Sequence, residues 1–311
     1  MRRLAALALS LVFLLTACGS SASPKAPGGS PSAAPKPAAG LFSVSGSFGD
    51  KPTLNFPSPT PPEGVQKKVL RQGTGPVVAK GDLLVADYLG QVWNGAVFDN
   101  SYDRKMPAGF PIGVGQVIPG WDQTLVGVTA GSRVLLSIPP AAGYGTQGNP
   151  RAKIKGTDTL AFVVDVISSY SKAAAGDPHA KAGQKPLKGV SVTGALGKAP
   201  TVTIAKGTPA PKALAAQILA RGTGAPITGG VLIVQVQAVD YTGKAAGSTW
   251  KVGTPAAAAL SASGSSMVFD VTRGVPLGSR VLIEVPAQGS QPPIAAVADL
   301  IAQPKSAKAT G

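Results

Sequence analysis

The sequence predicts an α+β protein in which one small domain occurs twice. Glycine and proline contribute 40 and 29 of the 311 residues, which indicates many turns and favours β structure over helical bundles. Short apolar segments typical of strands recur along the chain, whereas only one short helix is predicted. Several motifs also repeat at offsets of 147 to 149 residues. Several strands with one short helix indicate an antiparallel α+β domain.

Five segments are expected to form strands, namely residues 83–88, 134–138, 159–166, 231–239 and 280–285. The helix is expected to begin at Pro119, because proline suits the first turn of a helix. Trp121 and Leu125 are four residues apart and therefore lie on the same face of that helix.

The repeated motifs define the domain organisation. Residues 44–54 recur at 192–202, residues 73–75 at 222–224, and residues 131–136 at 278–283. Near the end, Asp165 matches Asp299 at a shorter offset of 134, so the second copy has lost about thirteen residues there. The predicted parts are a signal peptide at 1–17, a flexible Pro/Ser/Ala/Gly tether at 18–43, a first domain at 44–170, a linker at 171–188, a second domain at 189–303 and a tail at 304–311.

The N-terminus predicts export and a lipid anchor. Arg2 and Arg3 precede an apolar run at 4–15, which is shorter than the roughly 20 residues that span a membrane. The run ends in Leu15-Thr16-Ala17-Cys18, which resembles the bacterial lipobox and implies acylation of Cys18, the sole cysteine. We expect a lipid-anchored protein at the cell membrane, outside the cytoplasm; the alternative is an ordinary signal peptide with an incidental cysteine.

Composition excludes several classes of site. With one cysteine and one histidine, the chain cannot form a disulfide framework, and a Cys/His zinc site or a histidine-dependent triad is not expected. His179, beside Pro178 in the linker, is expected to be a surface residue. No metal or cofactor is predicted.

The formal net charge of +15 does not indicate a nucleic-acid partner. Residues 44–170 contain 11 basic and 9 acidic residues, and residues 189–303 contain 8 and 4. Most of the excess therefore lies in the signal peptide, tether, linker and tail. A groove that follows phosphates would instead concentrate it on a folded domain.

Aromatic residues gather in the first copy, where 11 of the 16 lie between residues 44 and 170. They stand in ordered motifs: Asp87-Tyr88-Leu89-Gly90, Val97-Phe98-Asp99-Asn100-Ser101 with Arg104, Phe110-Pro111-Ile112-Gly113, Gln116-Val117-Ile118-Pro119-Gly120-Trp121-Asp122, Gly131-Ser132-Arg133, Ile138-Pro139-Pro140, Gly143-Tyr144-Gly145, and Asp158-Thr159-Leu160 with Phe162. In order and spacing, this set closely resembles an FKBP-type peptidyl-prolyl cis-trans isomerase over about residues 65–168.

The resemblance implies tandem FKBP-like domains, each a twisted antiparallel sheet around one short helix, with a pocket between helix and sheet in the first. It implies that Trp121 forms the floor, that Asp99 and the Tyr144 hydroxyl form a polar rim, and that the Ile118 amide binds a substrate carbonyl. The implied walls are Tyr88, Phe98, Phe110, Val117, Ile118, Ile154 and Phe162. The implied partners are proline-containing segments of secreted proteins, with macrolide inhibitors as further ligands.

Three positions depart from the family pattern. Ala108 and Ala142 stand where aromatic residues are usual, and Asn149 stands where a histidine is frequent. We expect these changes to alter the preference around the substrate proline and the affinity for macrolides.

Two further patterns have a structural interpretation. Asp99 and Asp103 are four residues apart, but without a third ligand, and with Arg104 nearby, we expect ion pairs and hydrogen bonds rather than a metal site. Gly113-Val114-Gly115 is expected to form a turn, because it lacks the strand-to-helix setting of a dinucleotide site.

The second copy is predicted to be a folded domain without isomerase activity. In the repeat, Tyr88, Phe98, Asp99 and Trp121 correspond to Val236, Ala246, Gly247 and about Val268. Two functions remain open for the whole chain: an isomerase that assists folding of secreted proteins at the cell surface, or a chaperone-like module that binds proline segments with little catalysis. A ligand-capturing lipoprotein of a transporter fits less well, because it would need a larger two-lobed cleft.

Overall fold

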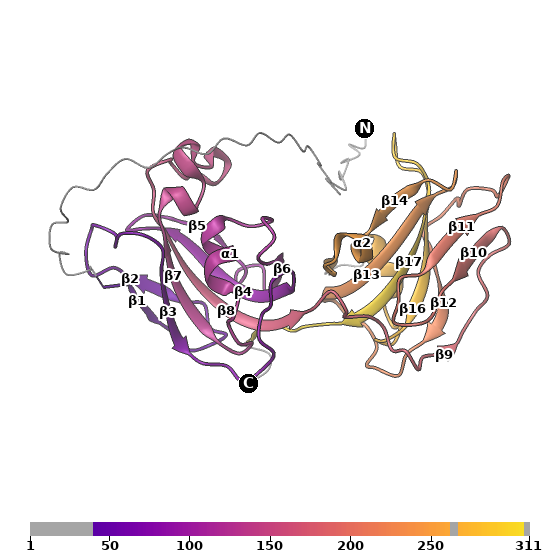
Figure 1. Ribbon diagram of the computed structural model, residues 1–311, viewed down its shortest axis with the longest axis horizontal. Helices are drawn as coiled ribbons and strands as arrows, with labels where there is room; N and C mark the ends of the chain where they lie inside the picture. The colour runs from indigo at the N-terminus through magenta and orange to yellow at the C-terminus, as the bar shows by residue number, and fades with distance from the viewer. Residues whose placement is uncertain (1–39, 262–266, 308–311) are drawn as a thin grey trace, which may run out of the picture. The chain divides into compact units, whose positions relative to one another are not determined.

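The computed structural model describes residues 40–261 and 267–307, which contain two large antiparallel sheets (Figure 1). Each half also contains a separate two-stranded hairpin, and helices are few and short, which confirms the α+β class. The predicted signal peptide, Cys18 and nearly all of the tether lie outside the described residues. Within those residues, no helix is long and apolar enough to cross a membrane.

The first half of the chain forms a hairpin and a six-stranded sheet. The sheet has the order β3-β7-β8-β4-β5, and β6 also pairs with β4. The strands are β1 (Ser43–Ser45) and β2 (Thr53–Asn55) in the hairpin, then β3 (Gln66–Arg71), β4 (Leu83–Val92), β5 (Val97–Asn100), β6 (Ala108–Pro111), β7 (Arg133–Ile138) and β8 (Leu160–Tyr170). Strands β4 and β8 each continue four residues beyond the predicted ends, because they pair with one another along their whole length.

Both faces of this sheet are covered. Helix α1 (Pro119–Leu125), which begins where predicted, buries Trp121 and Leu125 against one face. On the other face, Phe42, at the end of the predicted tether, packs with Trp93 and is only 2% exposed. Successive strand residues point to opposite faces. Val134, Leu136, Phe162 and Val164 therefore share the cluster of the helix, and Leu135, Ala161 and Val163 share that of Phe42.

The loop before α1 is tied to the helix. The Asp122 carboxylate accepts hydrogen bonds from the amides of Gly113 and Gly115 at 2.6 and 2.7 Å. Both glycines have positive φ angles, 78° and 75°, which residues with a side chain rarely adopt. This agrees with the predicted turn. The loop then delivers Val117 and Ile118 to the start of the helix.

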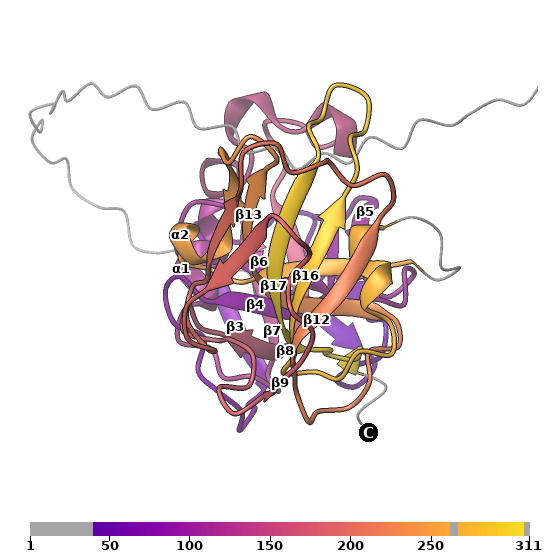
Figure 2. The same ribbon diagram turned by 90° about the vertical axis from the view of Figure 1, so that its right-hand side faces the viewer.

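The second half repeats this topology. The order β12-β16-β17-β13-β14 corresponds to β3-β7-β8-β4-β5, and β15 pairs with β13 as β6 pairs with β4. Figure 2 shows β12, β16 and β17 side by side. The elements are β9 (Lys181–Ala182), β10 (Val190–Thr193), β11 (Thr201–Ile204), β12 (Ala215–Arg221), β13 (Gly230–Asp240), β14 (Ala245–Ser248), α2 (Thr249–Val252), β15 (Ala256–Leu260), η4 (Val268–Thr272), β16 (Arg280–Val285) and β17 (Ile294–Ala302). Strand β9, inside the predicted linker, extends the sheet by pairing with β12.

An equivalent buried ion pair, here called the Arg–Asp clamp, lies in each sheet. Arg133 of β7 binds Asp165 of β8 through Nε–Oδ1 and Nη2–Oδ2 distances of 2.6 and 2.7 Å. Arg280 of β16 binds Asp299 of β17 at 2.6 and 3.0 Å. All four side chains are at most 4% exposed. The residues that the sequence repeat matches thus occupy corresponding strands.

Each clamp also holds its hairpin. The guanidinium of the first clamp donates to the carbonyls of Gly46 and Asp50 at 2.7 and 2.8 Å, and its carboxylate accepts from the Gly49 amide at 2.7 Å. The guanidinium of the second clamp donates to the carbonyls of Ala195 and Lys198 at 3.2 and 2.6 Å. A buried charge pair needs such extra hydrogen bonds to offset the loss of water.

Replacing Arg133 with methionine should lower the free energy of unfolding of the first half by about 3–5 kcal/mol, because a buried carboxylate loses its partner. The double variant Arg133→Met, Asp165→Leu should be less destabilised, since no charge is left buried. Urea unfolding followed by tryptophan fluorescence measures both. A double variant as unstable as the single one would contradict an electrostatic origin.

Candidate active site

The aromatic residues predicted for the pocket meet around Trp121 of α1. The centroid of its ring system lies 5.9 Å from that of Tyr88 on β4, 4.8 Å from that of Phe110 on β6 and 5.3 Å from that of Phe162 on β8. Phe98 of β5 joins through Phe162, with centroids 5.6 Å apart. The rings meet edge to face, the arrangement that aromatic quadrupoles favour. Four strands and one helix thus contribute to a single cluster.

Trp121 carries an unused hydrogen-bond donor. Its side chain is buried, and within the described part of the chain its Nε1 atom has no hydrogen-bond partner. Buried donors are almost always paired, because an unpaired donor loses its hydrogen bond to water and forms no other in its place. The Trp121 indole nitrogen is thus an exception among buried donors.

A polar triad borders the aromatic cluster. The Tyr88 hydroxyl donates to the Asp99 carboxylate. Arg104 donates to Asp99 at 2.5 Å and to the Tyr88 hydroxyl oxygen at 2.9 Å, with its guanidinium 5.6 Å from the centre of the Tyr88 ring. These contacts orient the Tyr88 ring and neutralise the only carboxylate in the triad.

The triad shifts two pKa values. Burial, followed by the neighbouring Asp99 carboxylate, raises the pKa of Tyr88 to about 12, so its hydroxyl stays protonated at neutral pH. Burial alone would raise the pKa of Asp99, but the hydrogen bonds from Tyr88 and Arg104 outweigh it and hold the pKa below its usual value. Asp99 is thus an ionised acceptor and not a proton donor.

The neighbouring carboxylate has its own partner. Asp103 forms an ion pair with Lys51 at 2.6 Å and accepts a hydrogen bond from Asn100. This confirms ion pairing and hydrogen bonding for Asp99 and Asp103. In the described ranges, no group of three or more His, Cys, Asp or Glu side chains could hold a metal ion. His179 is exposed, as expected.

The aliphatic residues of the predicted pocket lie beside the rings. Ile154 is buried in the same cluster, and Val117 and Ile118 pack against it from the loop before α1. Ile118 is the residue immediately before the helix. Its amide makes no hydrogen bond to any described residue, so it is free to bind a carbonyl.

Tyr144 stands apart from the other predicted residues. It lies between the 3-10 helices η1 (Pro140–Ala142) and η2 (Gly145–Gln147), and its side chain is 37% exposed. It has no aromatic partner among the described residues, and its hydroxyl makes no hydrogen bond to them. The hydroxyl can therefore bond only to a molecule outside the described chain, such as solvent or a peptide.

Sequence reasoning missed two contacts of this region. It placed Arg104 near Asp99 but did not predict its bond to Tyr88. It also missed Tyr102, whose hydroxyl donates to Asp165 of the first clamp at 2.9 Å. Nothing in the local sequence indicates this second contact, because the partners are 63 residues apart.

Comparison with known proteins gives the class of the first half. The family model described as FKBP-type peptidyl-prolyl cis-trans isomerase matches residues 75–167. The FK506-binding protein of Streptomyces anulatus is 38% identical over 120 residues, covering 38% of this chain and 97% of that protein. FK506-binding protein 1A of Aspergillus fumigatus is 38% identical over 112 residues, covering 36% and 99%. The crystal structure of FkpA from Escherichia coli is 36% identical over 34% of this chain and 48% of that one, with a TM-score of 0.32.

The family model and the sequence relatives place residues 75–167 among enzymes that isomerise the peptide bond before proline. The chain belongs to the FKBP-type peptidyl-prolyl cis-trans isomerase family. The family model ends at residue 167, before the first strand of the second sheet.

Replacing Tyr88 with phenylalanine should raise the pKa of Asp99, because one of the hydrogen bonds that lower it is lost. In the unmodified protein, the stability that ionised Asp99 contributes is present above the pKa of an unfolded aspartate, about 3.9. It is lost as the pH falls through the lower folded value. In the variant, the folded pKa lies closer to that of an unfolded aspartate, so the contribution should be smaller and its loss should be complete at a higher pH.

Carboxyl carbon NMR titration measures this shift. Lys51→Gln serves as the matched control, because it removes a partner of Asp103 and not of Asp99. An unchanged Asp99 titration in the Tyr88 variant would contradict the role of this hydrogen bond.

Proposed function

We propose that the first half of the chain catalyses cis–trans isomerisation of proline peptide bonds in secreted proteins, at the outer side of the cell membrane. The observation that carries the catalytic part is the cluster of five aromatic rings around Trp121, whose indole donor is unused. Family membership supports the same reaction. The location is supported by the sequence of the N-terminus alone.

The reaction needs no bond to be made or broken. Rotation about a peptide bond faces a barrier of about 18–20 kcal/mol, because resonance keeps the amide planar. Without a catalyst, a proline bond isomerises in tens to hundreds of seconds. A catalyst must therefore bind the twisted amide more tightly than the planar one, and each 1.36 kcal/mol of that difference accelerates rotation about tenfold.

The cluster suits this task. In the twisted state the amide has lost its charge-separated resonance form, so an apolar surface excludes it less strongly than the planar amide. We assign Trp121 to the floor beneath the proline ring and the other four rings to the walls. The Ile118 amide would donate to a substrate carbonyl, and the exposed Tyr144 hydroxyl would hold a second carbonyl, so that the peptide turns across the pocket. Asp99, fixed by Arg104, completes the polar rim.

The second sheet is proposed to be a diverged copy of the first that does not catalyse. Its strand order and Arg–Asp clamp support the common origin. The loss of catalysis is supported by the side chains that replace the aromatic cluster and its rim: Val236 lies on β13, Ala246 and Gly247 lie on β14, and Val268 begins η4. These residues offer neither an indole floor nor a carboxylate rim.

Trp121→Leu in the full chain should lower kcat/KM for a proline test peptide at least about tenfold, roughly 1.4 kcal/mol of transition-state stabilisation. Tyr144→Phe should cost about two- to tenfold, the value of one hydrogen bond. Protease-coupled or NMR exchange assays measure both. Because the second sheet is intact in these variants, full activity after Trp121→Leu would contradict a single catalytic site.

The same variants separate an enzyme from a chaperone-like binder. If the protein acts as an enzyme, the Trp121 variant should lose catalysis of proline-limited refolding. Binding of the unfolded client should be retained, as measured with Tyr144→Phe. If refolding is assisted equally by the unmodified protein and the Trp121 variant, the assistance comes from binding and the chaperone-like function is correct.

Cys18→Ser should release the protein from the membrane fraction. Two or three acyl chains, at about 0.8 kcal/mol for each buried methylene group, anchor a protein stably, whereas the polar tether residues cannot. Cell fractionation after a high-salt wash measures the change, and the unmodified chain is the control. A serine variant that stays in the membrane fraction would exclude the lipid anchor.

A further inference from the structure

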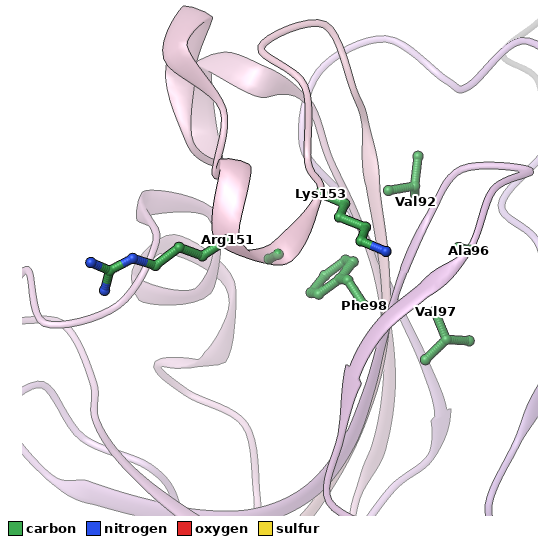
Figure 3. Close-up of a pocket in the computed structure, with 7 residues that line it drawn as sticks. Val92, Ala96, Val97, Phe98, Arg151 and Lys153 are labelled. Atoms are coloured by element: carbon green, nitrogen blue, oxygen red, sulfur yellow. The ribbon is translucent and has the colours of Figure 1, made fainter.

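A pocket of about 280 Å³ lies next to the aromatic cluster (Figure 3) and is here called the second pocket, to distinguish it from the substrate pocket predicted at that cluster. It is bounded by the turn that joins β4 to β5 and by the 3-10 helix η3 (Pro150–Ala152) with the residue that follows. Its apolar lining includes Val92, Ala96, Val97 and Phe98, and its basic lining consists of Arg151 and Lys153.

This pocket shares its walls with the predicted active site. Phe98 lines it and also packs against Phe162 of the aromatic cluster. Lys153 lines it, whereas the next residue, Ile154, is buried in the aromatic cluster. A peptide bound at the aromatic cluster is therefore within reach of the second pocket.

The charge of the pocket is uncompensated. No acidic side chain lines it. Lys153 is exposed, and its ammonium group makes no ion pair or hydrogen bond with the residues that the structure describes. The nearby Asp99 carboxylate is already bound by Arg104. In Figure 3 the Lys153 side chain extends beside the Phe98 ring, whereas Arg151 points away from it.

The backbone holds Lys153 in this place. Its φ of +56° is in the left-handed region, which non-glycine residues rarely enter. The Lys153 amide donates to the Pro150 carbonyl at 3.1 Å, and Asn149 and Ile154 exchange two backbone hydrogen bonds of 2.8 and 3.0 Å around it. The lysine is thus presented by an ordered turn.

We infer that the second pocket is a subsite for an acidic side chain of the client, close in sequence to the isomerised proline. The methylene groups of a glutamate would pack on Phe98 and Val97, the latter 45% exposed, and its carboxylate would pair with the Lys153 ammonium. The inference rests on the proposed isomerase function and adds a preference among its substrates.

The test uses the full chain and peptides with one central proline. A single glutamate is placed in turn at each of three positions on either side of the proline, and the glutamine peptide of each position is its reference. At one or two positions, glutamate should raise kcat/KM by about two- to fivefold, as expected for a partly exposed ion pair. The gain should appear in KM and should shrink at high salt.

Lys153→Gln should remove this gain, and Lys153→Glu should reverse the preference. Lys155→Gln is the matched control. It removes the same charge two residues away, in an exposed side chain that does not line the pocket. Ala96→Leu, which narrows the pocket, should reduce the gain as well.

The outcomes distinguish the subsite from the isomerase function. Isomerisation of all peptides with no preference for glutamate at any position would overturn the subsite alone. A preference that Lys155→Gln removes as fully as Lys153→Gln would also overturn it, because the effect would then belong to the overall charge. The absence of isomerisation for every peptide would overturn the proposed function and this subsite with it.

Discussion

The buried pair of Arg133 and Asp165 is the interaction on which the first half of the chain is organised. It links the neighbouring strands β7 and β8, and its remaining donors and acceptors bind the hairpin that covers one face of the sheet. A charge pair at this depth is costly unless every lone pair and proton is used, and here the backbone of the hairpin supplies the missing partners. Tyr102 extends the same network toward the strand that carries Asp99, so that the rim of the site and the clamp share one hydrogen-bonded frame.

The second half keeps the strand order, the clamp and the hairpin of the first, but it carries different side chains. Strand order, clamp and hairpin are all repeated, and these depend on backbone pairing and on two buried charged residues. The aromatic cluster depends on side chains that project from the frame, and these can be replaced by small aliphatic residues without loss of the sheet. The strand order is thus present twice in the described residues, whereas the aromatic cluster around Trp121 belongs to the first half.

The charged side chains around the site are of two kinds, those that form an ion pair and those that do not. Asp99 and Arg104 neutralise one another beside Tyr88, which leaves the aromatic cluster free of net charge and suited to an apolar ring. Lys153, which lines a pocket together with Phe98, has no such partner among the residues that the structure describes. Phe98 thus contacts both the apolar aromatic cluster and a pocket with a basic lining.

The sequence alone determined the class of the fold, the start of the helix at Pro119, the central strands and the correspondence between Arg133–Asp165 and Arg280–Asp299, because these follow from local periodicity and repetition. The order of the sequence motifs also identified the aromatic residues that form the cluster. Only the tertiary structure decided which side chains touch: the bond of Arg104 to Tyr88, the pairing of Lys51 with Asp103 across 52 residues, the burial of Phe42 and the pocket beside Lys153. These contacts depend on strand register and on how the loops close over the sheet, and no local pattern in the sequence carries that information.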